Sequence, residues 1–239
     1  MRIAFLSDIH GNADALEAVL EDINKKQADK IYVLGDIAYR GPEPKRSIAQ
    51  IQSLNTTVIK GNADEWVVRG VQRGEVPDQA LALMQKEQAW TVSQLEEKDI
   101  DYLSGLPDQA TFTESGVTFH LFHATPDSLF DVVLPDADEE KIATTFMQKE
   151  TADVYLYGHI HKAYIRYLNG RTVINTGSVG LPFDGTSKAS YAMVDVENGS
   201  ISTSIERVKY DIESPIEKYK ERQYPNTEMM ENIIRNARV

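Results

Sequence analysis

The sequence predicts an α/β fold in which two mixed β-sheets pack together in one domain. In the first half, short apolar runs alternate with segments of helical spacing, an order typical of a parallel sheet with crossover helices. The second half is richer in strand-like runs, and two Asn-Gly pairs in it predict tight hairpin turns. A length of 239 residues suits one large domain or two small ones, and no linker divides the chain. We therefore expect one domain over residues 1–239.

The first half contains three predicted strands and two predicted helices. The strands cover residues 3–6, 31–34 and 57–59. One helix follows the candidate N-cap Asn12, and the other covers residues 44–54. Because crossover helices make the strands parallel, the carboxyl ends of the strands meet at one edge of the sheet. Asp8, Asp36 and Asn62 lie just beyond these strands, so we expect them at that edge.

The pattern of residues 64–104 predicts helix, with a break near residues 70–77. Two interpretations suit this stretch equally: an inserted helical cap beside the site, or a pair of helices that pack on the core. Beyond it we expect a hairpin, a helix, five more strands and a helical tail from Ser214. These strands and the helix cover residues 110–113, 117–122, 138–149, 154–157, 164–168, 172–174, 191–196 and 201–208.

The composition narrows the possible functions. The chain has no cysteine, which excludes disulfides, a thiolate nucleophile and a cysteine-ligated metal. A formal net charge of −12 argues against a general affinity for the nucleic-acid backbone. No stretch reaches the ~18 apolar residues of a membrane span, and the N-terminus lacks the features of a signal peptide. We expect a cytoplasmic protein that binds neither duplex nucleic acid nor membrane, and the oligomeric state stays open.

The histidines gather in short polar turns. Of five histidines, four lie in three turns that follow apolar runs: Ser7-Asp8-Ile9-His10-Gly11, Phe122-His123-Ala124 and Gly158-His159-Ile160-His161. Two similar turns carry acceptor side chains: Gly35-Asp36 and Gly61-Asn62-Ala63-Asp64. Imidazole, carboxylate and amide oxygen are ligands for borderline divalent metals. Each turn alone suits a helix cap or a solvated loop, but five of them at one sheet edge predict a metal-activated hydrolase.

The order of these motifs is DxH, GDxxxRG, GNxD, a lone histidine after a strand, and GHxH, over residues 8–161. This order resembles the calcineurin-like metallophosphoesterase superfamily, and the loop at residues 175–180 is similar to one that follows GHxH there. The chain looks most like the small bacterial members, which include phosphodiesterases and dinucleoside-polyphosphate hydrolases. The resemblance implies a four-layer αββα sandwich, in which two mixed sheets are flanked by helices.

The resemblance also implies a two-metal site. The first ion would be held by Asp8, His10, Asp36 and His161, and the second by Asp36, Asn62, His123 and His159, so that Asp36 bridges the two. Asp36, Asn62 and His123 are expected to be catalytic. Manganese is favoured, although these nitrogen and oxygen ligands also suit iron and zinc. Such a site is expected to activate a metal-bridging hydroxide for in-line attack on phosphorus, without a covalent enzyme intermediate.

Arg40, in the GDxxxRG match, is expected to bind phosphate oxygens, because a guanidinium can grip them in bidentate fashion. Two positions depart from the protein-phosphatase branch of the superfamily. That branch has an aspartate at Tyr39 and a histidine at Ala63, and the two form a dyad that helps protonate the leaving group. A serine or threonine alkoxide leaves poorly without such an acid. We therefore expect cleavage of phosphodiester or phosphoanhydride bonds in a small nucleotide-type substrate, as in a diadenosine tetraphosphatase or a phosphodiesterase.

Other functions fit the same pattern less well. A protein serine/threonine or general phosphomonoester phosphatase would use the same metal site. A non-catalytic scaffold would share the fold, since fold alone does not prove catalysis, and a nucleotide-binding regulator with weak turnover is a third alternative. The complete ligand set favours an enzyme. Outside that set, Asp64 should either bond a ligand histidine or cap the next helix, and His120 should point to the opposite face of its strand.

Overall fold

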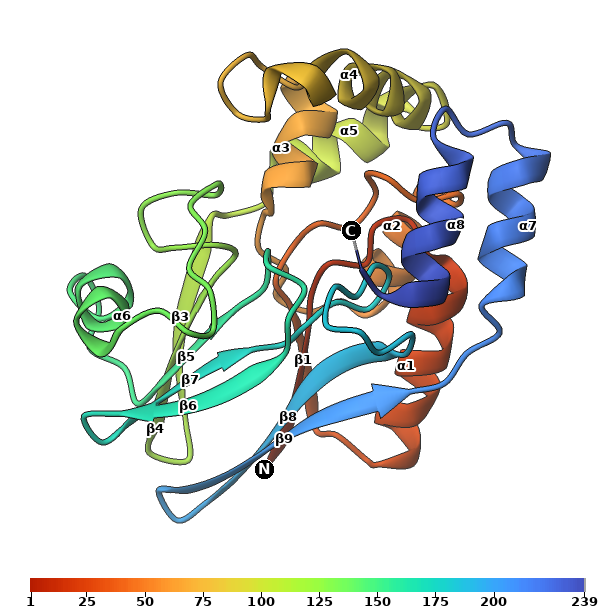
Figure 1. Ribbon diagram of the computed structural model, residues 1–239. Helices are drawn as coiled ribbons and strands as arrows, with labels where there is room; N and C mark the ends of the chain where they lie inside the picture. The colour runs from red at the N-terminus through yellow and green to blue at the C-terminus, as the bar shows by residue number, and fades with distance from the viewer. Residues whose placement is uncertain (239) are drawn as a thin grey trace.

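The computed structural model describes residues 1–238 and places nine strands and eight helices in them (Figure 1). The strands are β1 (Arg2–Leu6), β2 (Lys30–Val33), β3 (Gln109–Glu114), β4 (Val117–Phe122), β5 (Val154–Tyr157), β6 (Tyr164–Leu168), β7 (Arg171–Asn175), β8 (Ala189–Glu197) and β9 (Ser200–Val208). The helices are α1 (Ala13–Lys25), α2 (Pro44–Ser53), α3 (Asn62–Arg69), α4 (Asp78–Ser93), α5 (Glu97–Ser104), α6 (Glu139–Phe146), α7 (Glu213–Glu221) and α8 (Thr227–Asn236).

The strands form two mixed sheets, as predicted. The first sheet has the order β2-β1-β8-β9, and the second has the order β3-β4-β5-β7-β6. In the first, β1 runs parallel to β2 and antiparallel to β8. In the second, β4, β5 and β7 are parallel, while β3 and β6 add antiparallel edges. Of these parallel strands, β1, β2, β4 and β5 end on polar turns that carry ligands of the predicted metal site.

The two sheets pack face to face, and strand β1 shows how one strand serves two cores. Successive side chains of a strand point to opposite faces. Ile3 and Phe5 accordingly join the apolar core between the sheets, where Phe5 stacks on Tyr32 and Phe119. Ala4 and Leu6 join a second core that lies under the helices. The side chains of these four residues are fully buried, so β1 links two layers of the molecule.

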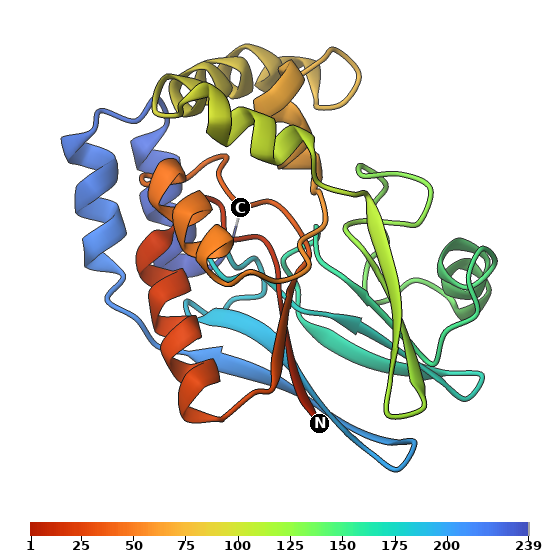
Figure 2. The ribbon, with the colours of Figure 1, turned by 180° about the vertical axis from the view of Figure 1, so that it is seen from behind.

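Helices cover both outer faces, which completes the four layers (Figures 1 and 2). Helices α1 and α2 cover the first sheet, and α6 covers the second through Ile142 and Phe146. The predicted helical stretch forms α3, α4 and α5, separated by a non-helical segment at residues 70–77 where a break was expected. Figure 1 shows these three helices above the end of the sheets at which β1 and β2 finish, with α7 and α8 beside them.

Two local signals in the sequence are satisfied as expected. The Asn12 side chain accepts a hydrogen bond of 3.1 Å from the backbone N–H of Ala15, which caps α1. Asn169 and Gly170 both have positive φ, the conformation that a two-residue hairpin turn requires. Among residues 1–238, each helix is too short or too polar to span a bilayer.

The predicted strand at residues 57–59 is wrong. This segment makes an isolated parallel bridge between Val58 and Val33, with hydrogen bonds on either side of Val33. The pairing stops there because the next N–H that faces β2, that of Gly61, donates to the Asp64 carboxylate, while the carbonyl of Gly35 accepts from Asp8. The segment therefore leaves the sheet one residue before Gly61, and this departure delivers Asn62 to the site.

The packing between the sheets can be tested at Phe5. We expect Phe5→Ala to lower the free energy of unfolding by about 3–5 kcal/mol, because the loss of a fully buried ring leaves a cavity between the sheets. Tyr167→Ala is the matched control, since Tyr167 is 70% exposed and its loss should cost less than about 0.5 kcal/mol. Urea unfolding measures both values, and equal losses for the two variants would contradict a core between the sheets.

Candidate metal centre

Five loops bring the seven predicted ligands together. Asp8 and His10 follow β1, Asp36 follows β2 and His123 follows β4. Asn62 begins α3, and the turn after β5 carries His159 and His161. Apart from His159, which is partly exposed, these side chains are buried. The sequence motifs thus meet at the carboxyl ends of the parallel strands, where sites of α/β proteins form.

Four of the side chains form one tight group: Asp8, His10, Asp36 and His161. Each offers one ligand atom, and these atoms all lie within 4.8 Å of one another. Nε2 of His161 lies 3.1 Å from Oδ1 of Asp8, and Nε2 of His10 lies 3.5 Å from Oδ2 of Asp36. Ligand atoms held at ~2.0–2.2 Å from one ion are roughly 3 Å apart. The spacing therefore suits a single bound cation.

The remaining side chains form a second group around Asn62. Its amide oxygen lies 3.0 Å from Nε2 of His123 and 2.8 Å from Nδ1 of His159. Nε2 of His123 lies in turn 3.4 Å from Oδ2 of Asp36. Asp36 thus belongs to both groups, as the predicted bridging ligand must.

The backbone of the site adopts a conformation that L-residues rarely take. Five of the seven predicted ligands have φ between 48° and 66°: Asp8, His10, Asp36, His159 and His161. Left-handed backbone is uncommon outside glycine, although Asp and His tolerate it better than most residues. Such strain is retained where the surrounding structure fixes it, often at functional sites. Here it turns alternate side chains of short loops towards one point.

Hydrogen bonds fix the tautomer of three imidazoles. Nδ1 of His10 lies 2.8 Å from the carbonyl of Tyr39, and Nδ1 of His123 lies 2.7 Å from that of Leu34. Nδ1 of His161 contacts the carbonyl of Leu181 in the same way. A carbonyl oxygen only accepts, so Nδ1 must carry the proton and Nε2 keeps a free lone pair in the neutral ring. Backbone partners of this kind orient metal-binding histidines.

These tautomers make the residues fit a cation. Nε2 of His10 lies 3.1 Å from Nε2 of His161, so two lone pairs face each other. Oδ1 of Asp8, also in this group, is fully buried and has no hydrogen-bond partner among the described residues. A buried acceptor without a partner is costly, and facing lone pairs repel. A positive ion between them removes both problems, which is the arrangement expected of a metal site.

The electrostatics of the site favour positive charge. Burial opposes protonation of His123, but the Asp36 and Asp8 carboxylates outweigh it and raise the pKa of His123 to about 10. Burial also opposes ionisation of Asp36, yet His123 holds its pKa well below the usual range. Burial lowers the pKa of His10 to about 4, so that its imidazole is neutral at pH 7. The buried carboxylates thus attract positive charge strongly, and a bound metal ion would take the place of the proton on His123.

Asp64 lies beneath the site and was only partly assigned from the sequence. Its Oδ2 accepts hydrogen bonds from the backbone N–H groups of Asp36 and Gly61, and its Oδ1 accepts from that of Ile37. The contact to Gly61 caps α3, which confirms the helix-cap interpretation. The bonds to Asp36 and Ile37 tie two ligand loops together, a role that the sequence did not indicate.

The comparison with known proteins agrees with this geometry. Residues 1–199 match the calcineurin-like phosphoesterase superfamily domain. The chain belongs to this superfamily. The uncharacterized protein MJ0912 of Methanocaldococcus jannaschii is 30% identical, with 93% of each chain covered. Phosphodiesterase YfcE of Escherichia coli is 28% identical over 82% of this chain and 88% of its own.

The solved structures point the same way. A metallophosphoesterase from Sphaerobacter thermophilus superimposes with a TM-score of 0.78 at 25% identity, covering 99% of both chains. These findings confirm the predicted resemblance to the calcineurin-like superfamily, the fold of two mixed sheets flanked by helices, and the assignment to the phosphoesterases. The buried group of Asp8, His10, Asp36 and His161 supports divalent-metal binding, without fixing which metal is bound.

The protein-phosphatase dyad of this superfamily has no substitute at its two positions. The hydroxyl of Tyr39 donates a hydrogen bond of 3.0 Å to the carbonyl of Met84. Burial raises the pKa of Tyr39 far above its usual value, so its proton is held tightly. Ala63 offers only its backbone N–H, which donates to Oδ1 of Asp36 at 2.7 Å. Neither position can protonate a leaving group readily.

A pocket of about 160 Å³ opens beside the metal ligands. Arg40 and the ligands His10, Asp36, Asn62, His159 and His161 line its polar side. Its apolar side comes from the helical stretch and from the loop after β7, through Trp66, Met84, Leu181 and Phe183. A substrate bound here would therefore meet both charged groups and apolar surface, since Phe183 stacks on the His161 ring with 4.2 Å between the ring centroids.

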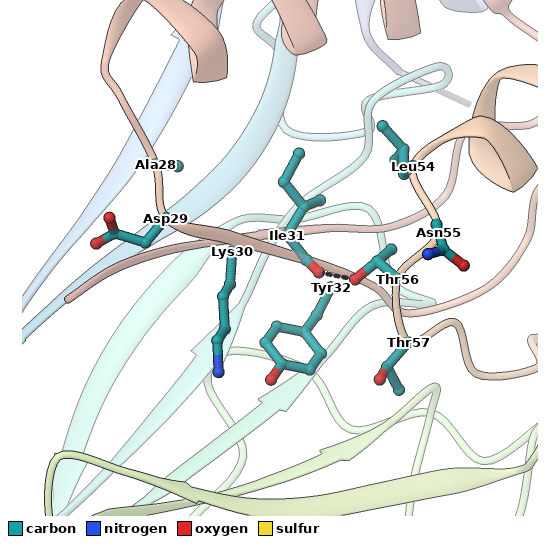
Figure 3. A pocket seen from close by; sticks show the side chains of 9 residues that line it. All are labelled: Ala28, Asp29, Lys30, Ile31, Tyr32, Leu54, Asn55, Thr56 and Thr57. Carbon is teal, nitrogen blue, oxygen red and sulfur yellow. Dashed lines mark hydrogen bonds between the residues drawn. The ribbon is translucent and has the colours of Figure 1, made fainter.

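A larger hollow of about 550 Å³ lies elsewhere (Figure 3). It is lined by residues 28–32, at the start of β2, and by residues 54–57 after α2. Arg2, at the start of β1, donates its backbone N–H to Asp29, which places this hollow at the amino ends of the strands. None of the seven predicted ligands lines it. We therefore place the substrate in the smaller pocket, where the ligands converge.

His120, the fifth histidine, lies apart from the site. Its Nε2 is 2.8 Å from the side-chain oxygen of Gln109, and its ring packs edge-on against Phe122 and Tyr155. The ring is fully buried on the side of the second sheet that faces α6. This placement agrees with the prediction that His120 points away from His123.

The close approach of the ligand loops can be tested at Gly61. A Cβ at this position would lie 2.1 Å from Oδ1 of Asp36, although its φ of −104° suits any residue. We expect Gly61→Ala to displace the Asp36 carboxylate and weaken manganese binding by about 10–100-fold. Gly105→Ala is the control, because its added methyl group meets nothing closer than 3.4 Å. Isothermal titration with manganese measures both affinities, and equal affinities would contradict this role.

Proposed function

We propose that the protein is a divalent-metal-dependent phosphodiesterase that cleaves small, nucleotide-type or aryl phosphodiesters with good leaving groups. The observation that carries the proposal is the pair of lone pairs that face each other at 3.1 Å between Nε2 of His10 and Nε2 of His161. They lie in a site rich in buried carboxylate, and a bound cation is the physical reason to keep them together. Membership of the phosphoesterase superfamily supports the same chemistry.

The proposed ligands divide into two sets that share Asp36. One ion would be held by Asp8, His10, Asp36 and His161, and the other by Asp36, Asn62, His123 and His159. When bound, the ions supply positive charge for the phosphate oxygens and lower the pKa of water towards ~7. Manganese is our proposed metal, because Asp and Asn oxygens as well as imidazoles suit it.

The protein's own residues position the phosphate. Arg40 lines the pocket beside the ligands, and its guanidinium can donate two parallel hydrogen bonds to phosphate oxygens. Asp64 anchors the Asp36 and Gly61 loops through backbone N–H groups, which keeps the shared carboxylate still. We assign Asp36, Asn62 and His123 to the catalytic centre, because Asp36 joins the two proposed ligand sets and His123 contacts both Asp36 and Asn62.

The missing acid dyad favours substrates whose leaving groups depart without a proton. The Tyr39 hydroxyl is committed to Met84, and Ala63 has no side-chain proton to give. An alkoxide of serine or threonine has a high pKa and therefore leaves slowly without an acid. A nitrophenolate or a nucleotide phosphate has a lower pKa and leaves more readily without protonation. This contrast ranks a protein phosphatase below a phosphodiesterase.

The pocket size and lining favour a small diester over a dinucleoside tetraphosphate. Its volume of about 160 Å³ is below the roughly 300–1,000 Å³ of typical ligand sites. Trp66, Met84 and Phe183 offer an apolar wall on which one aromatic ring can pack. A second nucleoside would have to lie outside this pocket. The phosphodiester substrate is therefore our first choice, and the tetraphosphate is the second.

A substrate panel with added manganese tests the proposal. We expect bis(p-nitrophenyl) phosphate to be hydrolysed faster than p-nitrophenyl phosphate, a dinucleoside tetraphosphate or a phosphoserine peptide, and chelation to abolish the activity. Metal analysis of the purified protein accompanies the panel. Comparable turnover of the phosphoserine peptide would overturn the substrate class. A protein that neither binds metal nor hydrolyses any of the four compounds would indicate a scaffold.

Two histidines of the same segment provide a matched pair of variants. His123→Ala should lower kcat/KM by at least about 100-fold, because it removes a proposed ligand of the catalytic centre. His120→Ala lies only three residues away and is equally buried, but faces α6, so its kcat/KM should change by less than about twofold. An Asp36→Ala preparation that keeps wild-type activity would reveal a contaminating enzyme. Equal losses in the two histidine variants would remove His123 from the site.

A further inference from the structure

A buried carboxylate from α4 lies against Arg40. Oε2 of Glu87 is 3.3 Å from Nε of Arg40, and the Glu87 side chain is fully buried. A glutamate is rarely fully buried without a partner, because burying an unpaired charge costs much free energy. Glu87 is 47 residues from Arg40 in the chain and contacts both Arg40 and the Tyr39 hydroxyl, two residues that line the pocket.

The C-terminal helices hold both members of this pair. Nδ2 of Asn226, at the N-cap of α8, donates to Oε1 of Glu87 at 3.1 Å. The hydroxyl of Tyr219, on α7, donates to the backbone carbonyl of Arg40. The sulfur of Met229 lies 4.0 Å from an Nη atom of Arg40. Helices α4 and α8 therefore contact the guanidinium of Arg40, and α7 contacts its backbone.

We propose that Glu87 is a positioning residue, which together with Asn226 orients the guanidinium of Arg40 for phosphate. The inference rests on the proposed function, because it takes Arg40 as the phosphate-binding group. It adds a residue outside the metal-site motifs and a role for α4 and α8. Nε of Arg40 lies beside Glu87 in an ion pair but makes no hydrogen bond among the described residues. The two Nη atoms, one of which contacts only the Met229 sulfur, stay available to the substrate, and paired Nη donors match two phosphate oxygens.

The flexibility of the Arg40 side chain explains why a partner that fixes its position is useful. Arg40 has φ of 70°, a conformation unusual for a long side chain, and lies in the loop between β2 and α2. A free arginine side chain has many rotamers, and ordering it on substrate binding costs conformational entropy. A partner that fixes the side chain beforehand removes this cost from binding. Glu87 supplies that partner from a rigid helix.

A purely electrostatic effect of Glu87 and a positioning role predict opposite effects of its neutralisation on phosphate binding, which makes the proposal testable. Glu87 is an anion beside a pocket for an anionic substrate, so its neutralisation would on electrostatic grounds strengthen phosphate binding. If Glu87 orients Arg40, its neutralisation weakens phosphate binding instead. If Glu87 only stabilises the fold, neutralisation lowers the melting temperature and the fraction of active enzyme, but leaves KM unchanged.

The decisive variant is Glu87→Gln in the full-length, manganese-loaded protein. We expect KM for bis(p-nitrophenyl) phosphate and the inhibition constant of inorganic phosphate to rise together by about tenfold, while kcat changes by less than about twofold. Glu96→Gln is the matched control, because it removes an exposed ion pair with Lys45 at the start of α5 and should leave both constants unchanged. A fall in KM, or a loss confined to kcat, would overturn the proposal.

A double-mutant cycle with Arg40→Gln shows whether Glu87 acts through Arg40. In the Arg40→Gln background, Glu87→Gln should have no further effect on KM or on phosphate inhibition. Additive effects would show that Glu87 acts by another route and would contradict the proposal. If Glu87→Gln does not fold, Asn226→Ala replaces it, since this change leaves the ion pair intact and should raise KM by about threefold. An unchanged KM in a folded Asn226→Ala protein would equally count against it.

Failure of the positioning role can be told apart from failure of the proposed function. If the function is wrong, the wild-type protein neither hydrolyses the diester nor is inhibited by phosphate. If only the positioning role is wrong, the wild type is active and inhibited by phosphate, and Glu87→Gln matches it in both constants.

Discussion

The contact between the imidazoles of His10 and His161 constrains the rest of the structure. Both rings donate Nδ1–H to backbone carbonyls, so their Nε2 lone pairs meet 3.1 Å apart in a buried site. This arrangement repels itself unless positive charge lies between the rings. The loops after β1 and β5 must therefore be held in place by the two sheets behind them. The stability of the site comes from that frame and from a bound cation, while the ligands themselves oppose their own assembly.

The sheets can hold the ligand loops in place because glycines let the backbone of one loop lie directly against the next loop. The backbone of Gly61 lies against the Asp36 carboxylate, and Gly158 lies against Ser7 and Asp8, with no room for a Cβ at either position. Asp64 adds a second tie, since its carboxylate binds the backbone of both the Asp36 loop and the Gly61 loop. Burial and the Asp36 charge raise the pKa of Asp64 to about 7, which three backbone N–H donors counteract. The loops thus act as one unit, although they come from distant parts of the chain.

Most of this arrangement follows from local sequence patterns. Apolar runs that end in polar turns fix both the strands and the edge at which Asp8, Asp36 and the histidines meet. The predicted strand at residues 57–59 fails because the N–H of Gly61 donates to the Asp64 carboxylate, and the carbonyl of Gly35 accepts from Asp8, a distant partner that no local pattern indicates. The sequence predicts that Asp64 either bonds a ligand histidine or caps a helix. It does not predict the bonds of Asp64 to the Asp36 loop, because these depend on how two strands lie side by side. Side chains that serve two loops cannot be inferred from the periodicity of either one.

Glu87 is the clearest case of information that only the fold supplies. In the sequence it sits in a polar helical segment, where a glutamate ordinarily faces solvent. In the fold it is fully buried and shares Arg40 with α7 and α8, which lie beyond residue 199, where the superfamily match ends. The metal ligands all lie within residues 8–161 and belong to the shared domain. The groups that contact Arg40 come partly from outside it. Under the proposed role of Arg40, substitutions in the C-terminal helices would change phosphate binding while the metal ligands stay the same.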